Sequence, residues 1–202
     1  MNYIMIRTDD MLNGSGLRVV LFCTACDHYC HNCHNPETWQ ASNGHLFDSK
    51  AKQEIFKELD KDYISGITLS GGDPLNVNNV SEIFDLILEI KDKYPNKTIW
   101  LYTGFVWEEI MSYEAELKNA KNELLNAEKW RKLMHYDVND FTYKESIFNL
   151  RKQIISKCDV VVDGKFIEEK SDVNYPWAGS TNQRVIDVKK SLLKNEVVLW
   201  SE

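Results

Sequence analysis

Three cysteines near the N-terminus have the spacing of ligands to a soft metal centre. Cys26, Cys30 and Cys33 form the pattern C-x3-C-x2-C within the segment "CTACDHYCHNC". Thiolates at these separations on a loop can converge on one zinc ion or on one iron–sulfur cluster. The segment also carries aspartate, histidine, tyrosine and asparagine, so it is too polar for a core strand. The pattern therefore predicts a metal site.

The kind of metal depends on a fourth thiol, Cys23, which stands three residues before Cys26. Four thiolates, or three with His28, His31 or His34, would complete the tetrahedral coordination that zinc prefers. The histidines are weaker candidates, because a polar loop gives them ordinary reasons to be solvated or hydrogen-bonded. Three thiolates alone would leave one iron of an iron–sulfur cluster open to a ligand that is not protein. Since Cys23 ends the apolar run "LRVVLFC", we expect it to be a small buried side chain.

A glycine-rich turn, "SGGDPL" at residues 70–75, follows a short predicted strand and precedes a predicted helix. Gly71 and Gly72 would let the backbone approach a ligand closely, and Asp73 adds a carboxylate that could accept hydrogen bonds from an ammonium group. A tight turn that needs positive φ would use the same residues. Alone, this motif is weakly specific.

The elements that would position these residues alternate between strand and helix. Helical spacing occurs at residues 48–61, with a cap at Asp48 or Ser49, and at residues 76–94, up to the stop at Pro95. The predicted strands are "GLRVVLF", "SGITLS", "KTIWLY", "CDVVV" and, more weakly, "RVIDV". This alternation predicts an α/β domain with a mainly parallel sheet. Ligands bind at the carboxyl ends of such strands, where the cysteine segment, "GGDP", "TG" and "DGK" follow, so we expect one edge to gather all four.

A long segment lacks strong helix breakers. No glycine lies between Phe105 and Asp163, and no proline lies between Pro95 and Pro176. We expect a helical insertion around residues 107–157, with its central part at about 113–146, packed on the side of a single domain that spans residues 1–202. The segment "KESIFNLRKQIISK" is predicted to form a helix of its own.

Composition limits the classes of partner. The 202 residues are 43% hydrophobic and 27% charged, and 24 Lys and Arg against 31 Asp and Glu give a net charge of -7. Without a basic cluster, nucleic acid is not an expected partner. We find no signal-like N-terminus and no long apolar run, and therefore expect a soluble, cytoplasmic protein with no membrane partner. An odd number of cysteines, five, with four of them bunched within eleven residues, argues against a disulfide framework.

Together, the cysteine triplet after the first of these strands and "GGDP" after the second resemble the radical S-adenosylmethionine superfamily. Other segments resemble its glycyl-radical-enzyme activating family, in particular the activators of anaerobic ribonucleoside-triphosphate reductase. They are "CHNPETW", "LYTGFVWEEI", "CDVVVDGKFIEE" and "GSTNQRVIDVKKSL". Two features depart from that family: Thr24-Ala25 replaces a Ser-Gly pair, and the helical segment is longer than expected.

The resemblance implies a partial (β/α) barrel of the radical S-adenosylmethionine type and assigns roles to single residues. Cys26, Cys30 and Cys33 would bind three irons of a [4Fe-4S] cluster and leave Cys23 free. The open iron would chelate the methionine moiety of S-adenosyl-L-methionine. The cofactor would lie along Asn32, Cys33 and His34, and its amino group would be received by Gly71, Gly72 and Asp73. Thr103, Asp163 and Lys165 would lie on the same rim.

The resemblance also implies the chemistry and the partners. One electron from the cluster would split S-adenosylmethionine, and the resulting 5′-deoxyadenosyl radical, rather than a protein acid or base, would be the reactive species. That radical would take a hydrogen atom from a glycine of the reductase subunit, and a small reducing flavoprotein would supply the electron. Two alternatives are an activator of another glycyl-radical enzyme and a zinc-binding interaction module that uses Cys23.

Overall fold

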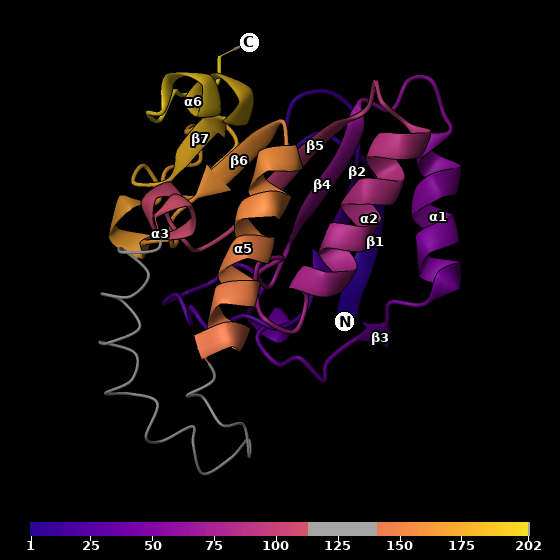
Figure 1. Ribbon diagram of the computed structural model, residues 1–202, viewed down its shortest axis with the longest axis horizontal. Helices are drawn as coiled ribbons and strands as arrows, with labels where there is room; N and C mark the ends of the chain where they lie inside the picture. Colours follow the sequence, from indigo (N-terminus) through magenta and orange to yellow (C-terminus); the bar gives the residue numbers. More distant parts are fainter. Residues whose placement is uncertain (113–140, 202) are drawn as a thin grey trace.

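The computed structural model describes residues 1–112 and 141–201, and these residues form a seven-stranded open sheet with helices (Figure 1). The strand order is β3-β1-β2-β4-β5-β6-β7. The strands are β1 (Asn2–Asp10), β2 (Arg18–Cys23), β3 (His45–Leu46), β4 (Gly66–Gly71), β5 (Thr98–Tyr102), β6 (Val160–Asp163) and β7 (Arg184–Asp187). The helices are α1 (Ser49–Leu59), α2 (Val80–Lys93), α3 (Trp107–Met111), α5 (Phe141–Lys157) and α6 (Val188–Lys194), with single 3-10 turns at Pro36–Thr38 and Glu168–Lys170.

The centre of the sheet is parallel and its edges are antiparallel. Strands β2, β4, β5 and β6 pair in parallel and in chain order, whereas β1 is antiparallel to β2 and β7 is antiparallel to β6. The predicted α/β class and mainly parallel sheet are therefore confirmed. Strands β1 and β3 and helix α6 were not predicted. Strand β3 has only two residues and α6 only seven, which is too short for a clear hydrophobic period, and β1 is only partly buried along most of its length.

Helices α1, α2 and α5 lie on one face of the sheet, because each connects one parallel strand to the next (Figure 1). The strand residues that face them are fully buried aliphatic side chains, such as Leu21, Leu69 and Leu101. The helices contribute Ile55, Ile83, Ile87 and Ile154 to the same core. Burial of this apolar area supplies the main favourable free energy of folding.

On the other face of the sheet, the guanidinium of a buried arginine packs over the ring of a tryptophan. Arg18 is fully buried, donates to Thr68 Oγ1 over 2.8 Å and to Thr98 Oγ1 over 2.9 Å, and lies 5.4 Å from the centre of the Trp100 ring. Burial lowers the pKa of Arg18 to about 10. Trp100 in turn contacts Trp177 of the C-terminal segment, with ring centres 5.8 Å apart. These side chains fill that part of the face with packed groups.

Helix boundaries follow the local signals. Asp48 caps α1 as predicted, since its side chain accepts hydrogen bonds from Lys50 N and Ala51 N. Helix α2 ends before Pro95, and the predicted helix at residues 144–157 falls within α5. Residues 113–140, most of the expected central part at about 113–146, lie outside the described residues. Among the helices described, none has both the length and the apolar character to span a membrane.

Candidate functional site

The four segments singled out in the sequence meet at the carboxyl ends of the parallel strands, as predicted. They are the cysteine loop (24–35), the glycine turn (71–75), the TGF loop (103–106) and the DGK loop (163–170). Asp73 N donates to Ala25 O over 2.8 Å and so joins the first two. Gly164 N donates to Phe105 O over 2.9 Å and joins the last two.

The backbone distinguishes three of the four N-terminal cysteines. Cys26, Cys30 and Cys33 each directly follow a non-glycine residue in the left-handed region. These residues are Ala25 (φ 67°), Tyr29 (φ 47°) and Asn32 (φ 51°). The left-handed conformation costs about 1–2 kcal/mol for an L-residue, and such strain concentrates at functional sites. Turns of this kind also aim backbone N–H groups inward, as many iron–sulfur sites require. Cys23 instead ends strand β2.

Backbone N–H groups point at the thiols of the cysteine loop. Burial, followed by the charge of Asp73, raises the pKa of Cys26 to about 12, while the backbone N–H of His28 lowers it. Cys33 Sγ accepts a hydrogen bond from Asn35 N over 3.4 Å. These donors favour the thiolate, which is the form that binds metal.

Cys30 is contacted by the DGK loop. Burial raises the pKa of Cys30, whereas the backbone N–H of Phe166 and the charge of Lys165 lower it. The charge of Cys33 raises the pKa of both Cys26 and Cys30, so the three thiols share one electrostatic environment. Lys165, expected on the rim, is therefore placed near the cysteines.

Cys23 lies in the core, at the end of strand β2. It is 1% exposed, its Sγ donates to Ser70 O over 3.2 Å, and it accepts from Asn79 Nδ2 over 3.6 Å. Burial raises its pKa far above the ordinary value of a thiol. The expectation of a small buried side chain at a strand end is confirmed.

The donor set is compatible with an iron–sulfur cluster. Within residues 1–112 and 141–201, no three His, Cys, Asp or Glu side chains are placed to hold one metal ion. The cysteine ligands of an iron–sulfur cluster bind different irons, so they lie farther apart than the ligands of one ion. Three thiols on one polar loop, with N–H donors to their sulfurs, suit such a cluster.

Asp73 joins three of the loops through its carboxylate. The residue is 1% exposed and accepts from His28 Nε2 over 2.6 Å, Thr103 Oγ1 over 2.9 Å, Gly104 N over 3.1 Å and Leu75 N over 2.8 Å. Burial raises the pKa of Asp73, but the hydrogen bond and charge of His28 and the two backbone donors lower it below its usual value. Thr103 thus lies at the predicted rim, with its hydroxyl engaged by Asp73.

The other rim carboxylate, Asp163, supports neighbouring elements. It is 1% exposed, accepts from Trp107 N over 2.7 Å and binds Arg184 Nε over 3.0 Å. It therefore holds the first residue of α3 and strand β7 at the end of β6. Asp163 contributes to the rim as a structural anchor.

Glu168 and Phe166 are contacts that the sequence analysis missed. Glu168 accepts from Asn32 Nδ2 over 2.5 Å and lies 2.7 Å from His31 Nδ1. The Phe166 ring lies 5.0 Å from the ring of His34. The motif "VDGKFIEE" indicated that this loop reaches the same edge, but it did not show which of its side chains face the cysteines.

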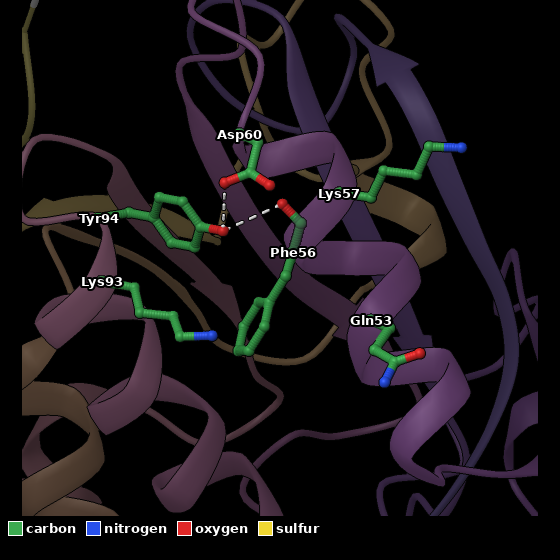
Figure 2. A pocket seen from close by; sticks show the side chains of 6 residues that line it. All are labelled: Gln53, Phe56, Lys57, Asp60, Lys93 and Tyr94. Atoms are coloured by element: carbon green, nitrogen blue, oxygen red, sulfur yellow. Dashed lines mark hydrogen bonds between the residues drawn. The ribbon is translucent and has the colours of Figure 1, made fainter.

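A separate hollow lies between α1 and α2, and none of its residues belongs to the four loops (Figure 2). Its lining residues are Gln53, Phe56, Lys57, Asp60, Lys93 and Tyr94. The Tyr94 hydroxyl donates to Asp60 Oδ1 over 2.7 Å, and Lys93 Nζ lies 4.5 Å from the centre of the Phe56 ring. These contacts link the two helices at the hollow.

Comparison with known proteins agrees with an iron–sulfur site. The family model described as a 4Fe-4S single cluster domain matches residues 12–129 and 117–186. The chain is 36% identical over 185 residues to the anaerobic ribonucleoside-triphosphate reductase-activating protein of Enterobacteria phage T4, covering 92% of this chain and 93% of the relative. The proteins of the same name from Haemophilus influenzae and Escherichia coli are each 32% identical, covering 91% and 92% of this chain and 96% and 97% of the relatives.

Proposed function

The chain belongs to the family of anaerobic ribonucleoside-triphosphate reductase-activating proteins, and we propose that it activates such a reductase by generating a glycyl radical on it. The observation that carries the proposal is the set of three cysteines, each after a left-handed residue, at the strand edge that also presents the glycine turn. Within this proposal the protein is a radical S-adenosylmethionine oxidoreductase.

The residues that would hold the cofactors lie on the cysteine loop and the glycine turn. Cys26, Cys30 and Cys33 would each bind one iron of a [4Fe-4S] cluster. S-adenosylmethionine would lie along the segment from Asn32 to His34, with its amino group at the turn of Gly71, Gly72 and Asp73. Support comes from the hydrogen bond of Asp73 N to Ala25 O, which places the turn directly beside the cysteine loop.

The protein's own groups hold and shield these ligands. When bound, the reduced cluster would supply the single electron that cleaves S-adenosylmethionine, so that a hydrogen atom can be taken from a glycine of the reductase. Cys26 is 9% exposed, and Tyr29 packs edge-on against Trp39 with ring centres 5.3 Å apart. This contact holds the loop against the 3-10 turn that Trp39 ends. The chemistry requires no protein acid or base.

The proposal extends to fold type, partners and place of action. Four parallel strands in chain order with connecting helices on one face support a partial barrel of the radical S-adenosylmethionine type. The protein partner is the glycyl-radical subunit of the reductase, and a small reducing flavoprotein donates the electron. The complex acts in the cytoplasm under anaerobic conditions.

The proposal is tested by anaerobic reconstitution with iron and sulfide, followed by mixing with the reductase subunit, S-adenosylmethionine and a reductant. We expect a glycyl radical signal in electron paramagnetic resonance. The signal should require the reconstituted protein, the reductase subunit, S-adenosylmethionine and the reductant together. Metal analysis of the same sample distinguishes this proposal from the main alternative, a zinc-binding module. About one zinc per chain, without iron or sulfide, would contradict the proposal and favour a zinc-binding module.

A further inference from the structure

We propose that His28 is a positioning residue that holds the cysteine loop on the carboxylate of Asp73, so that Cys26 and Cys30 keep their ligand geometry. The inference rests on the proposed function, since it assigns a role toward the metal group that these cysteines would bind. It also changes the role of Asp73. Its carboxylate becomes a junction between loops. The two glycines of the turn pack on the cysteine loop, because a Cβ at Gly72 would lie 2.7 Å from Ala25 O, and Gly72 N donates to Cys23 O over 2.7 Å.

The position of His28 in the chain suits this role. It stands two residues after Cys26 and two before Cys30, so its side chain controls the path between them. Its side chain is 10% exposed, and its Nε2 lies 2.6 Å from Asp73 Oδ2. A short hydrogen bond between an imidazole and a buried carboxylate fixes the orientation of both groups.

The surroundings of His28 are shaped to its ring. The Phe105 ring packs against it edge-on, with centres 4.7 Å apart and planes at 78°. Gly104 leaves the space that the imidazole fills, because a Cβ at this position would lie 2.3 Å from His28 Cδ2. The TGF loop therefore packs directly against the imidazole ring.

Asp73 has no acceptor position left for a further strong donor. Its two oxygens accept from His28, Thr103, Gly104 and Leu75, and the residue is 1% exposed. The donors come from the cysteine loop, the TGF loop and the glycine turn itself. One carboxylate thus ties together the loops that follow β2, β4 and β5.

Helix α5 supports this part of the TGF loop through Arg151. The Arg151 guanidinium lies 4.3 Å from the centre of the Phe105 ring, and its Nε donates to Leu75 O over 2.8 Å. Arg151 therefore holds both the Phe105 ring and the turn that carries Asp73. This contact connects the cysteine loop to the helix that packs on the sheet.

The cysteine loop needs such a contact because its backbone is strained at the three residues that precede Cys26, Cys30 and Cys33. A strained loop persists only where surrounding contacts determine its conformation. Groups that orient metal ligands without touching the metal typically account for about 10- to 100-fold in metal affinity. Loss of His28 leaves Asp73 with its other donors, so we expect the fold to survive.

The test compares the full-length wild type with His28→Ala, His28→Gln and His31→Ala after anaerobic reconstitution. The readout is the rate at which a chelator removes the bound metal, with iron and sulfide content measured before the chase. We expect His28→Ala to lose metal about 10- to 100-fold faster than the wild type. His28→Gln, whose Nε2 amide can reach Asp73, should restore slow release. His31→Ala is the matched control, because His31 lies on the same loop next to Cys30 but its side chain is 81% exposed.

Two results would overturn the inference. Release from His28→Ala at the wild-type rate would show that the contact positions nothing. Equal release from His28→Gln and His28→Ala would show that the hydrogen bond to Asp73 is not the cause. The assay uses whichever metal the wild-type chain holds, so a zinc-loaded wild type would refute the proposed function while the variants still decide the role of His28.

Discussion

The residues before the cysteines give a physical criterion for choosing among four neighbouring thiols. Left-handed backbone at Ala25 is notable because its Cβ makes this conformation costly, whereas glycine adopts it without steric cost. Strain at the residues before Cys26, Cys30 and Cys33 supports the proposed ligand set, whereas Cys23 lies in a regular strand.

The ligand set predicts different effects for two serine substitutions. Cys23→Ser should keep the iron–sulfur cluster, because a hydroxyl can still donate to Ser70 O at this buried position. Cys30→Ser should lose most of it, because a serine hydroxyl is a poor ligand for iron beside thiolates. Iron and sulfide per chain after anaerobic reconstitution provide the measurement. Equal loss in both variants would refute the assignment, and circular dichroism of each variant controls for unfolding.

At the scale of elements, short strands and helices are stabilised by side chains at their ends. Strand β7 and helix α6 share the residue Asp187, whose side chain accepts from Lys190 N over 2.9 Å and whose backbone N–H donates to Val198 O. Burial raises the pKa of Asp187, but hydrogen bonds and the charge from Lys190 lower it below its ordinary value. The carboxylate therefore stabilises the start of α6, at the edge of the sheet.

Removing this cap should weaken the protein in a pH-dependent way. Asp187→Ala should lower the free energy of unfolding by about 1 kcal/mol near neutral pH. Because the folded pKa is depressed, the carboxylate's contribution is present above its unfolded pKa, near 3.8, and is lost as the pH falls through the folded value. The difference between wild type and Asp187→Ala, measured by urea denaturation, should shrink over that acidic range.

Asp187→Asn is the matched control for the capping interaction. Asparagine is also a good N-cap, so this variant should lose only a few tenths of a kcal/mol at neutral pH, and without the acid dependence. A loss in Asp187→Asn as large as that in Asp187→Ala would show that the pairing with Lys190 Nζ, at 2.8 Å, matters more than the cap.

For the molecule as a whole, stability is concentrated in the centre of the sheet. Strands β2, β4 and β5 are parallel neighbours with fully buried aliphatic residues, whereas β3 consists of two exposed residues. The site loops extend from the most buried strands, so they are anchored on the most stable part of the fold. This arrangement suits a site that must hold strained backbone.

Hydrogen exchange should reproduce this gradient. Amides of β2, β4 and β5 should exchange slowest, while those of β3 and of β7 near its C-terminal end should exchange faster, because edge strands open locally more often. Mass spectrometry of peptic fragments from the apoprotein provides the measurement. Protection of β3 equal to that of β4 would contradict the expected distribution of stability.

By itself, the sequence determined the alternation of strands and helices, the N-cap of α1, the end of α2 before Pro95, and the four segments that lie at one edge. These features are readable because hydrophobic period, capping residues and turn residues act locally, and because parallel strands bring their carboxyl ends together. Cys23 was also assigned correctly to the core from the apolar run that it ends.

Only the tertiary structure decided how the side chains at that edge pair. The contact of His28 with Asp73 spans 45 residues and that of Asn32 with Glu168 spans 136, and no periodic pattern specifies either. The antiparallel pairing of β1 and β7 is likewise a property of neighbouring strands in space. Asp73 appeared in the sequence as a carboxylate open to a ligand, and the fold surrounds it with four donors because three loops converge on it.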